Sequence, residues 1–234
     1  MLKTLVKVSN ITNLSDARYC AGMGVEMIGF VMDKDSIDYV SPEKMKEIKS
    51  WVAGVLTVGE TQSADYEEVK EFIDAYEIDI LQISDASLLP QIADLGKPII
   101  LKLDFDGAYF ENSLERYSPF ITFFLADGGE LSDFVKDALK KYSFNYPIVL
   151  DFGIAAHNIN DLLEEINLHG IALKGSNEIR PGSKDYDELR DILEILEIDW
   201  ISTSILTIQP LFFKTFIKNT PLTLFFSIHV VCYT

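Results

Sequence analysis

Short apolar runs alternate with amphipathic stretches from residue 2 to residue 199. Runs rich in Val, Ile, Leu and Phe are typical of strands that are buried on both faces of a parallel sheet. Eight such runs predict strands at Thr4–Val8, Met27–Val31, Ala53–Val58, Ile80–Ile83, Ile99–Leu103, Ile121–Leu125, Ile148–Leu150 and Ile171–Lys174.

The amphipathic stretches between these runs predict helices. Their ranges are Ser15–Met23, Pro42–Trp51, Tyr66–Tyr76, Leu88–Leu95, Phe110–Tyr117, Leu131–Tyr142, Asn158–Leu168 and Tyr186–Leu196. Ser41 followed by Pro42 is a helix start signal, because serine caps free amides and proline suits the first helical turn. Eight strands that are each followed by a helix predict the α/β class and a closed (β/α)8 TIM barrel.

The last 34 residues differ from the rest of the chain. Residues 201–234 contain no Asp or Glu, and they hold two apolar stretches, Ile201–Phe213 and Pro221–Tyr233. Neither stretch reaches the ~20 apolar residues that a membrane-spanning helix needs. We therefore expect a barrel over residues 1–200 and an apolar tail, 201–234, outside it. A role for the tail in oligomerisation or at a membrane surface stays open.

Charge and cysteine content limit the partners of the chain. The formal net charge of −17, with no basic stripe, argues against nucleic acid and against an anionic membrane. Cys20 and Cys232 form neither a metal motif nor a disulfide framework. The chain begins directly with a strand-like run, so we expect a cytoplasmic protein. No His/Cys cluster indicates a metal site, so we expect no metal.

In a (β/α)8 barrel the chemistry lies on the loops that follow the strands. Phosphate often binds there to backbone amides after strands seven and eight. The candidate residues are Gly153, Ile154, Lys174, Gly175, Ser176 and Asn177. Ordinary strand–helix turns remain the alternative for these positions. Carboxylates at other strand ends indicate either solvated loops or a site for a divalent cation or a cationic ligand, and they are Asp104, Asp106, Asp127 and Asp151.

Several motifs carry a resemblance to one family. Residues 7–12 read K-V-S-N-I-T, residues 28–31 read I-G-F-V and residues 39–43 read Y-V-S-P-E. Over about residues 3–196 the chain resembles phosphoribosylanthranilate isomerase, whose corresponding motifs are K-I-C-G-I-T, L-G-F-V-F and S-P-R-Y-V-S-P-E. The resemblance implies a cofactor-free Amadori rearrangement of N-(5'-phosphoribosyl)anthranilate in tryptophan biosynthesis, and hence a phosphorylated small molecule as ligand.

The family mechanism implied by this resemblance uses a general acid and a general base. The acid position corresponds to Asp127. The base position, a cysteine in the family, corresponds to Ser9, and an alcohol works as a base only with a neighbouring proton acceptor. The sequence pattern shows no such acceptor near Ser9.

Two substrate-binding positions also depart from the family pattern. The family arginine that meets the anthranilate carboxylate corresponds to Asp38, and the histidine of L-Q-L-H-G corresponds to Ser84. These departures predict a phosphoribosylanthranilate isomerase-like protein with a degraded acid–base site. One alternative is a catalytically lapsed relative that binds a phosphorylated metabolite or a protein, and another is a barrel enzyme with new chemistry at its acidic strand ends.

Overall fold

A computed structural model describes residues 1–105, 107–175, 178–180, 183–184 and 187–198. The described part of the first 198 residues forms one compact unit. Asp106, Ser176, Asn177 and the expected tail over residues 201–234 lie outside the described residues. The predictions made for them therefore stay predictions.

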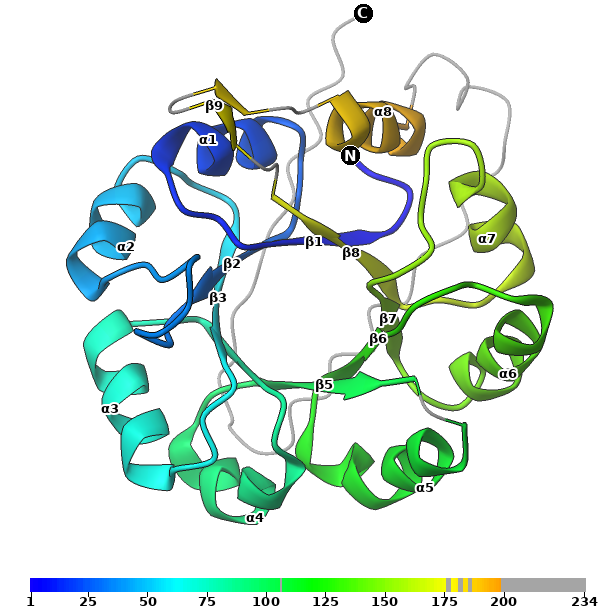
Figure 1. Cartoon of the computed structure of the whole chain (residues 1–234), viewed down its shortest axis with the longest axis horizontal. Helices are drawn as coiled ribbons and strands as arrows, with labels where there is room; N and C mark the ends of the chain where they lie inside the picture. The colour runs from blue at the N-terminus through cyan, green and yellow to red at the C-terminus, as the bar shows by residue number, and fades with distance from the viewer. Residues whose placement is uncertain (106, 176–177, 181–182, 185–186, 199–234) are drawn as a thin grey trace, which may run out of the picture. The chain divides into compact units, whose positions relative to one another are not determined.

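Eight parallel strands form a closed barrel in chain order, and β1 pairs with both β2 and β8 (Figure 1). This arrangement confirms the predicted TIM-barrel fold. The strands are β1 Leu5–Ser9, β2 Met27–Val31, β3 Leu56–Thr61, β4 Ile80–Ile83, β5 Ile99–Asp104, β6 Phe123–Asp127, β7 Ile148–Leu150 and β8 Gly170–Lys174. A short antiparallel pair that the apolar pattern did not predict follows β8, namely β9 Glu178–Arg180 and β10 Ser183–Lys184.

Helices surround the barrel on its outer side (Figure 1). They are α1 Leu14–Gly22, α2 Pro42–Lys49, α3 Tyr66–Tyr76, α4 Leu89–Ile92, α5 Gly107–Tyr117, α6 Asp133–Ser143, α7 Ile159–Glu165 and α8 Asp187–Leu196. Three short 3₁₀ turns accompany them, Ala86–Leu88, Ala93–Leu95 and Ser118–Phe120. Within the described residues, no helix is long and apolar enough to cross a membrane.

Polar caps fix where several helices begin. The Ser41 side chain accepts a hydrogen bond from the Lys44 amide, with proline in the first turn of α2. Asp65 does the same for α3 through the Glu68 amide at 3.1 Å. Each cap satisfies an amide that has no partner within its own helix. The sequence signal at Ser41 was therefore a correct start signal.

Strands β3 and β6 extend by two residues or more beyond the ends that the apolar pattern indicated. The run Ala53–Val58 predicted the end of the third strand, but β3 continues through Gly59 and Glu60 to Thr61. Likewise β6 ends at Asp127 rather than at Leu125. In both cases polar residues continue the strand because their side chains line the inner end of the barrel rather than a loop.

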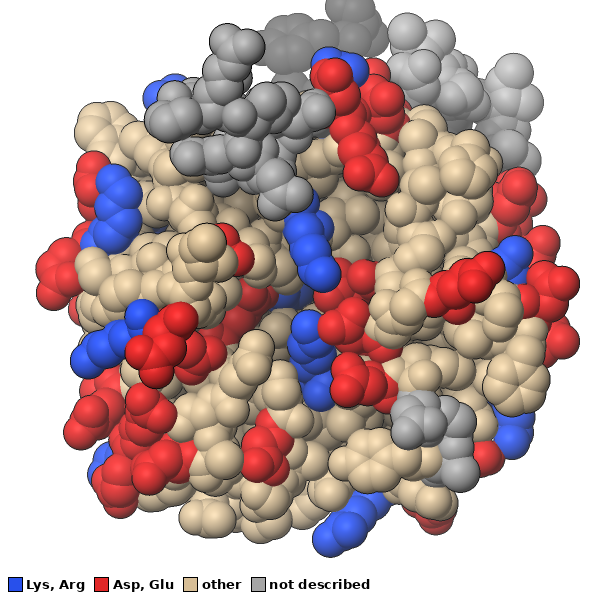
Figure 2. Space-filling view, viewed as in Figure 1, with Lys and Arg blue, Asp and Glu red and all other residues tan. Residues whose placement is uncertain are grey.

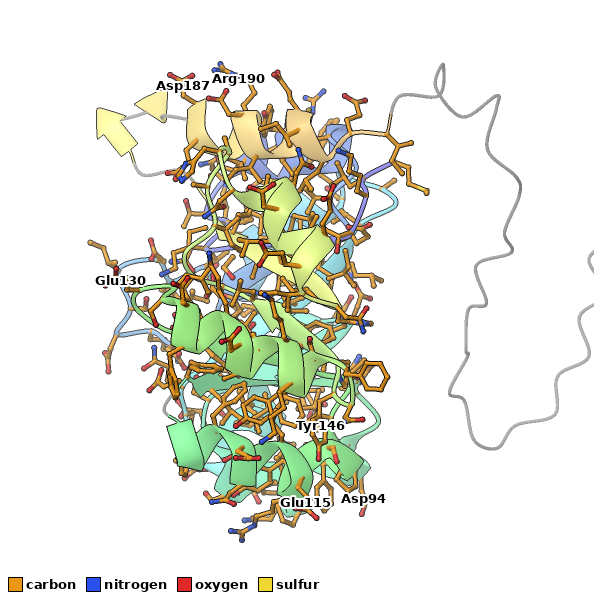
Figure 3. The ribbon with its side chains drawn as sticks, turned by 90° about the vertical axis from the view of Figure 1, so that its right-hand side faces the viewer. Asp94, Glu115, Glu130, Tyr146, Asp187 and Arg190 are labelled. Atoms are coloured by element: carbon orange, nitrogen blue, oxygen red, sulfur yellow. The ribbon has the colours of Figure 1, made fainter. Side chains whose placement is uncertain are left out.

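The two ends of the barrel are distinct. Glu130, in the loop after β6, and Tyr146, in the loop before β7, lie toward opposite ends in the side view of Figure 3. The larger hydrophobic core lies between strands and helices. A second apolar cluster fills the inside of the barrel near the strand starts and comprises Met27, Val58, Ile80, Ile100, Phe123, Leu125, Val149 and Ala172.

Candidate active site

A cavity of about 740 Å³ opens at the end of the barrel where the strands terminate. Acidic and basic side chains gather around the centre of this end in the space-filling view (Figure 2). The cavity is lined mainly by polar residues from the ends of β2, β3, β4, β5 and β8 and from the loops that follow them. Asp38 and Ser84, the predicted substrate positions, both line it.

Strand β1 carries a buried polar network. Lys7 is 0% exposed and Ser9 is 5% exposed. The Lys7 Nζ donates to Ser9 Oγ at 2.5 Å and forms an ion pair with Glu60 of β3, which is also buried. A Cβ atom at position 29 would come within 2.0 Å of Glu60 Oε1 and 3.2 Å of Lys7 Nζ. Glycine at position 29 therefore leaves the space that this pair occupies.

The polar neighbour of Ser9 is an ammonium group, which is a donor and not a proton acceptor. Lys7 lies two residues before Ser9 on the same strand face, and Glu60 reaches the same place from β3. An ammonium has only donors, so Ser9 Oγ accepts from Lys7 and keeps its own hydroxyl proton for another partner. The arrangement therefore gives Ser9 no base that could remove its hydroxyl proton.

A second set of charged side chains lies on β5 and β6 and directly after β7. The Lys102 Nζ pairs with Asp127 Oδ2 at 2.7 Å. Burial lowers the pKa of Lys102, but the hydrogen bond and charge of Asp127 outweigh it, and the pKa of Lys102 is raised overall. Burial also raises the pKa of Asp151 to about 6; the charge of Lys7 opposes this rise and the charge of Asp127 adds to it. Asp151 is therefore a carboxyl that titrates near neutral pH.

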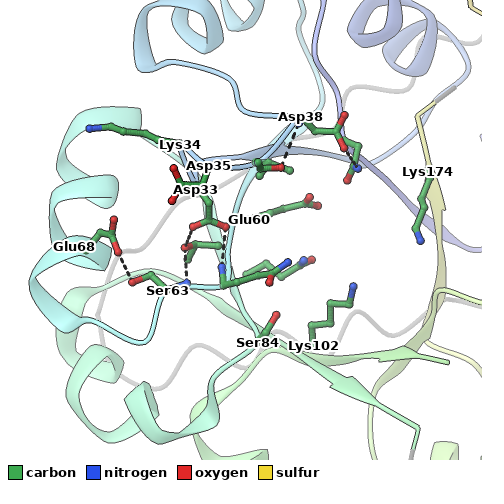
Figure 4. Close-up of a pocket in the computed structure, with 16 residues that line it drawn as sticks. Asp33, Lys34, Asp35, Asp38, Glu60, Ser63, Glu68, Ser84, Lys102 and Lys174 are labelled. Atoms are coloured by element: carbon green, nitrogen blue, oxygen red, sulfur yellow. Dashed lines mark hydrogen bonds between the residues drawn. The ribbon is translucent and has the colours of Figure 1, made fainter. Parts of the chain in front are cut away.

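The loop after β2 supplies acidic groups on the other side of the cavity (Figure 4). Asp38 accepts a hydrogen bond at Oδ2 from Asn10 Nδ2, at 2.7 Å. Asp33 accepts from the Thr61 hydroxyl at 2.5 Å and from the Gln62 amide at 2.9 Å. Asn10 has a φ of 60°, a conformation that asparagine tolerates better than most residues. The position of the family arginine thus holds a carboxylate that is anchored by Asn10.

The predicted phosphate-binding residues that the structure describes follow β7 or lie at the end of β8. Gly153 has a φ of 67°, and a Cβ there would come within 2.5 Å of Leu131 Cβ. The Gly175 amide donates to the Ser9 carbonyl oxygen at 2.8 Å, so this amide is already used within the protein. Lys174 is exposed and lines the cavity, while Ile154 is half-buried. Phosphate binding at these loops stays a prediction.

Among the described residues, no group of three or more His, Cys, Asp or Glu side chains is arranged to hold a metal ion. Asp104 is exposed at the end of β5 and pairs in register with Asp127. Cys20 is buried on α1. Two pairs of opposite charge lie at this end, Lys7 with Glu60 and Lys102 with Asp127.

The sequence pattern gave no role to Lys7, Gln82 and Lys102. Each lies inside a strand rather than on the loop that follows it. A signal did exist, because side chains two residues apart share one strand face. Lys7 precedes Ser9 by two residues, and Lys102 precedes Asp104 by two. A charged residue at an inward strand position needs a partner or a ligand, so these lysines pointed to a polar barrel end.

Sequence comparison identifies a family for this barrel. The model of the family "N-(5'-phosphoribosyl)anthranilate (PRA) isomerase" matches residues 6–195. The chain belongs to this family. The isomerase of Maridesulfovibrio salexigens is 25% identical over 198 residues, covering 80% of this chain and 96% of that protein. The isomerase of Rubrobacter xylanophilus is 28% identical over 196 residues, covering 79% and 95%.

Solved structures of this isomerase family share the fold. Phosphoribosyl anthranilate isomerase from Thermotoga maritima superimposes with a TM-score of 0.71 at 22% identity, covering 82% of this chain and 98% of that one. Another structure contains the isomerase in complex with reduced 1-(o-carboxyphenylamino)-1-deoxyribulose 5-phosphate, with a TM-score of 0.70 and 23% identity. At such sequence identities the likeness to these structures concerns the fold alone.

Proposed function

We propose that this protein is an isomerase of the phosphoribosylanthranilate isomerase type. It carries out the Amadori rearrangement of an N-(5'-phosphoribosyl)arylamine, and it is slow on N-(5'-phosphoribosyl)anthranilate itself. The observation that carries the proposal is the grouping of Ser9, Lys102, Asp127 and Asp151 at one end of the barrel. Family membership supports the reaction type, which in the relatives serves tryptophan biosynthesis.

The reaction needs one proton given and one proton taken. Protonation of the ribose ring oxygen breaks its bond to C1 and leaves a Schiff base, and removal of the C2 proton then leads to the enol and the ketone. Asp127 holds the acid position. Asp151 is the carboxylate we assign as base, because a group with a pKa of about 6 is mostly ionised at neutral pH and still accepts a proton readily.

Two features support low activity on the anthranilate derivative. Ser9, held as a donor by Lys7, cannot replace the family's cysteine as a base, although it can donate to an oxygen of the ligand. Asp38 presents a carboxylate where the family presents an arginine to the anthranilate carboxylate. Two like charges about 5 Å apart at a partly screened site repel by a few kcal/mol at most, on the order of 1–3.

A second candidate function is binding without turnover. The contact of Asn10 with Asp38 favours it, since both residues are occupied with each other at the rim of the cavity. In this case the protein binds a phosphorylated metabolite, and the acid–base set is a structural remnant. For either candidate function we propose a cytoplasmic location.

The test is a fluorescence assay of the purified protein with N-(5'-phosphoribosyl)anthranilate. We expect slow turnover that is lost in Asp127→Asn and raised about tenfold or more in the double variant Ser9→Cys, Asp38→Arg. A rate typical of enzymes in the unmodified protein would show that Ser9 and Asp38 do not limit it. No turnover in either form, together with saturable binding of ribose 5-phosphate, would favour the second candidate.

A further inference from the structure

The cavity has two chemically different sides. Lys102 of β5 and Lys174 of β8 lie on one side, and the carboxylates of Asp33, Asp35 and Asp38 approach from the loop after β2 (Figure 4). Strand β1 lies between β8 and β2 in the barrel. A ligand that extends from the β8 end to the loop after β2 therefore passes from a basic to an acidic environment.

An unpaired buried acceptor adds to this picture independently. Gln82 of β4 is 6% exposed and lines the same cavity. Its Oε1 atom has no hydrogen-bond partner within the described residues. A buried carbonyl oxygen without a partner is unfavourable, so a donor on a ligand would bind there favourably. The cavity thus offers a neutral acceptor in addition to the carboxylate of Asp38.

The carboxylate of Asp38 is held in place rather than free to turn away. Asn10 donates to Oδ2 at 2.7 Å, and the Asp38 amide in turn donates to Ser36 Oγ at 3.2 Å. Asn10 follows Ser9 directly, so the anchor of Asp38 is built onto the end of β1. A fixed carboxylate repels an anionic substituent and attracts a cationic or hydrogen-bond-donating one.

We infer that the preferred ligand is a phosphosugar whose nitrogen substituent carries a cationic or hydrogen-bond-donating group, which meets Asp38 and Gln82 while the phosphate lies toward Lys174. This inference rests on the proposed function, because it assumes that a phosphoribosylamine occupies the cavity. It names the substrate class that the acidic side selects. The specificity residues are Asp38, anchored by Asn10, and Gln82.

The experiment measures binding by calorimetry with three matched probes and ribose 5-phosphate. The probes are reduced 1-(o-carboxyphenylamino)-1-deoxyribulose 5-phosphate and its o-carboxamide and o-aminomethyl counterparts. We expect the aminomethyl probe to bind about tenfold or more tightly than the carboxylate probe, with the carboxamide between them. Asp38→Asn keeps an acceptor for Asn10 but removes the charge, so it should reduce the difference to about threefold or less.

Asp35→Asn is the matched control, since Asp35 is exposed on the same loop and lines the same cavity. It removes the same charge without the Asn10 anchor, and it should leave the preference within about twofold. Equal affinity for the three probes, or tighter binding of the carboxylate probe, overturns the inference but leaves the isomerase proposal standing. Binding of none of the probes and no binding of ribose 5-phosphate overturns both.

Discussion

The two halves of the barrel interior differ in polarity. Near the strand starts the interior is apolar, with Phe123, Leu125 and Val149 among its members. Near the strand ends the same strands carry paired charges, including Lys102–Asp127. Apolar packing stabilises the fold without direction, whereas paired charges contribute little net stability and fix chemical groups in place. The comparison teaches that the apolar end stabilises the barrel, whereas the polar end holds charged groups in fixed positions.

The largest expected effect falls on chemistry at the polar end. Asp127→Asn keeps the size of the side chain and removes its acid function, so turnover should fall about 10²–10⁴-fold. The free energy of unfolding should change by less than about 1 kcal/mol, since the Lys102 pair is partly exposed. Steady-state kinetics and urea unfolding of the same preparation measure both. A loss of stability with unchanged turnover would contradict the division between the two ends.

At the apolar end the effects should be reversed. Phe123 is 2% exposed, and Phe123→Ala should lower the free energy of unfolding by about 3–5 kcal/mol because it leaves a cavity. Affinity for ribose 5-phosphate in the folded fraction should stay within about threefold of the unmodified protein. Urea unfolding and calorimetry at low temperature check this. Phe123→Leu serves as a control that removes less volume and should cost less.

The buried pair of Lys7 and Glu60 lies at the boundary between the two halves. Lys7→Met leaves Glu60 buried without its partner, so the free energy of unfolding should fall by about 3 kcal/mol or more. The double variant Lys7→Met, Glu60→Leu removes both charges and should recover most of this loss. If both variants lose the same stability by urea unfolding, the unpaired charge is not the cause.

Asp151 makes the free energy of unfolding of the protein depend on pH. Its pKa is about 6 in the folded protein and near the ordinary value of 3.8 when unfolded. Between these values the folded form holds the proton more tightly, so the stability contribution of Asp151 falls as pH rises from about 4 to 6. Relative to Asp151→Asn, the loss should be about 3 kcal/mol, because the pKa differs by about two units at about 1.4 kcal/mol each, with no further change above the folded pKa. Unfolding free energies of both proteins across this range test it.

The smallest effect should come from outside the barrel. The tail beyond residue 200 carries no acidic residue, and we expect it to be dispensable. Truncation after Trp200 should change the free energy of unfolding by less than about 0.5 kcal/mol and leave solubility equal or better. Thermal unfolding and size-exclusion chromatography compare the two lengths. A drop of several degrees in melting temperature would assign the tail a structural role.

The apolar pattern predicted the barrel because each strand supplies a run of outward- and inward-facing apolar residues. The pattern predicted that β3 ends at Val58, since Gly59 and Glu60 resemble a turn. Because of this error the pattern did not indicate that Glu60 is the partner of Lys7. It also joined the 3₁₀ turns and α4 into one helix across Pro90. Contacts such as Lys102 with Asp127 depend on which strands are neighbours in the closed barrel, and no local pattern contains that information.

The missing side chain at Gly29 also couples three positions of the chain. A Cβ at position 29 would come within 2.0 Å of Glu60 Oε1, so a larger residue there requires the Glu60 side chain to move. The Glu60 carboxylate is buried against Lys7, so moving it separates the two charges in a buried place. The effects of substitutions at positions 7, 29 and 60 on the free energy of unfolding should therefore not be additive.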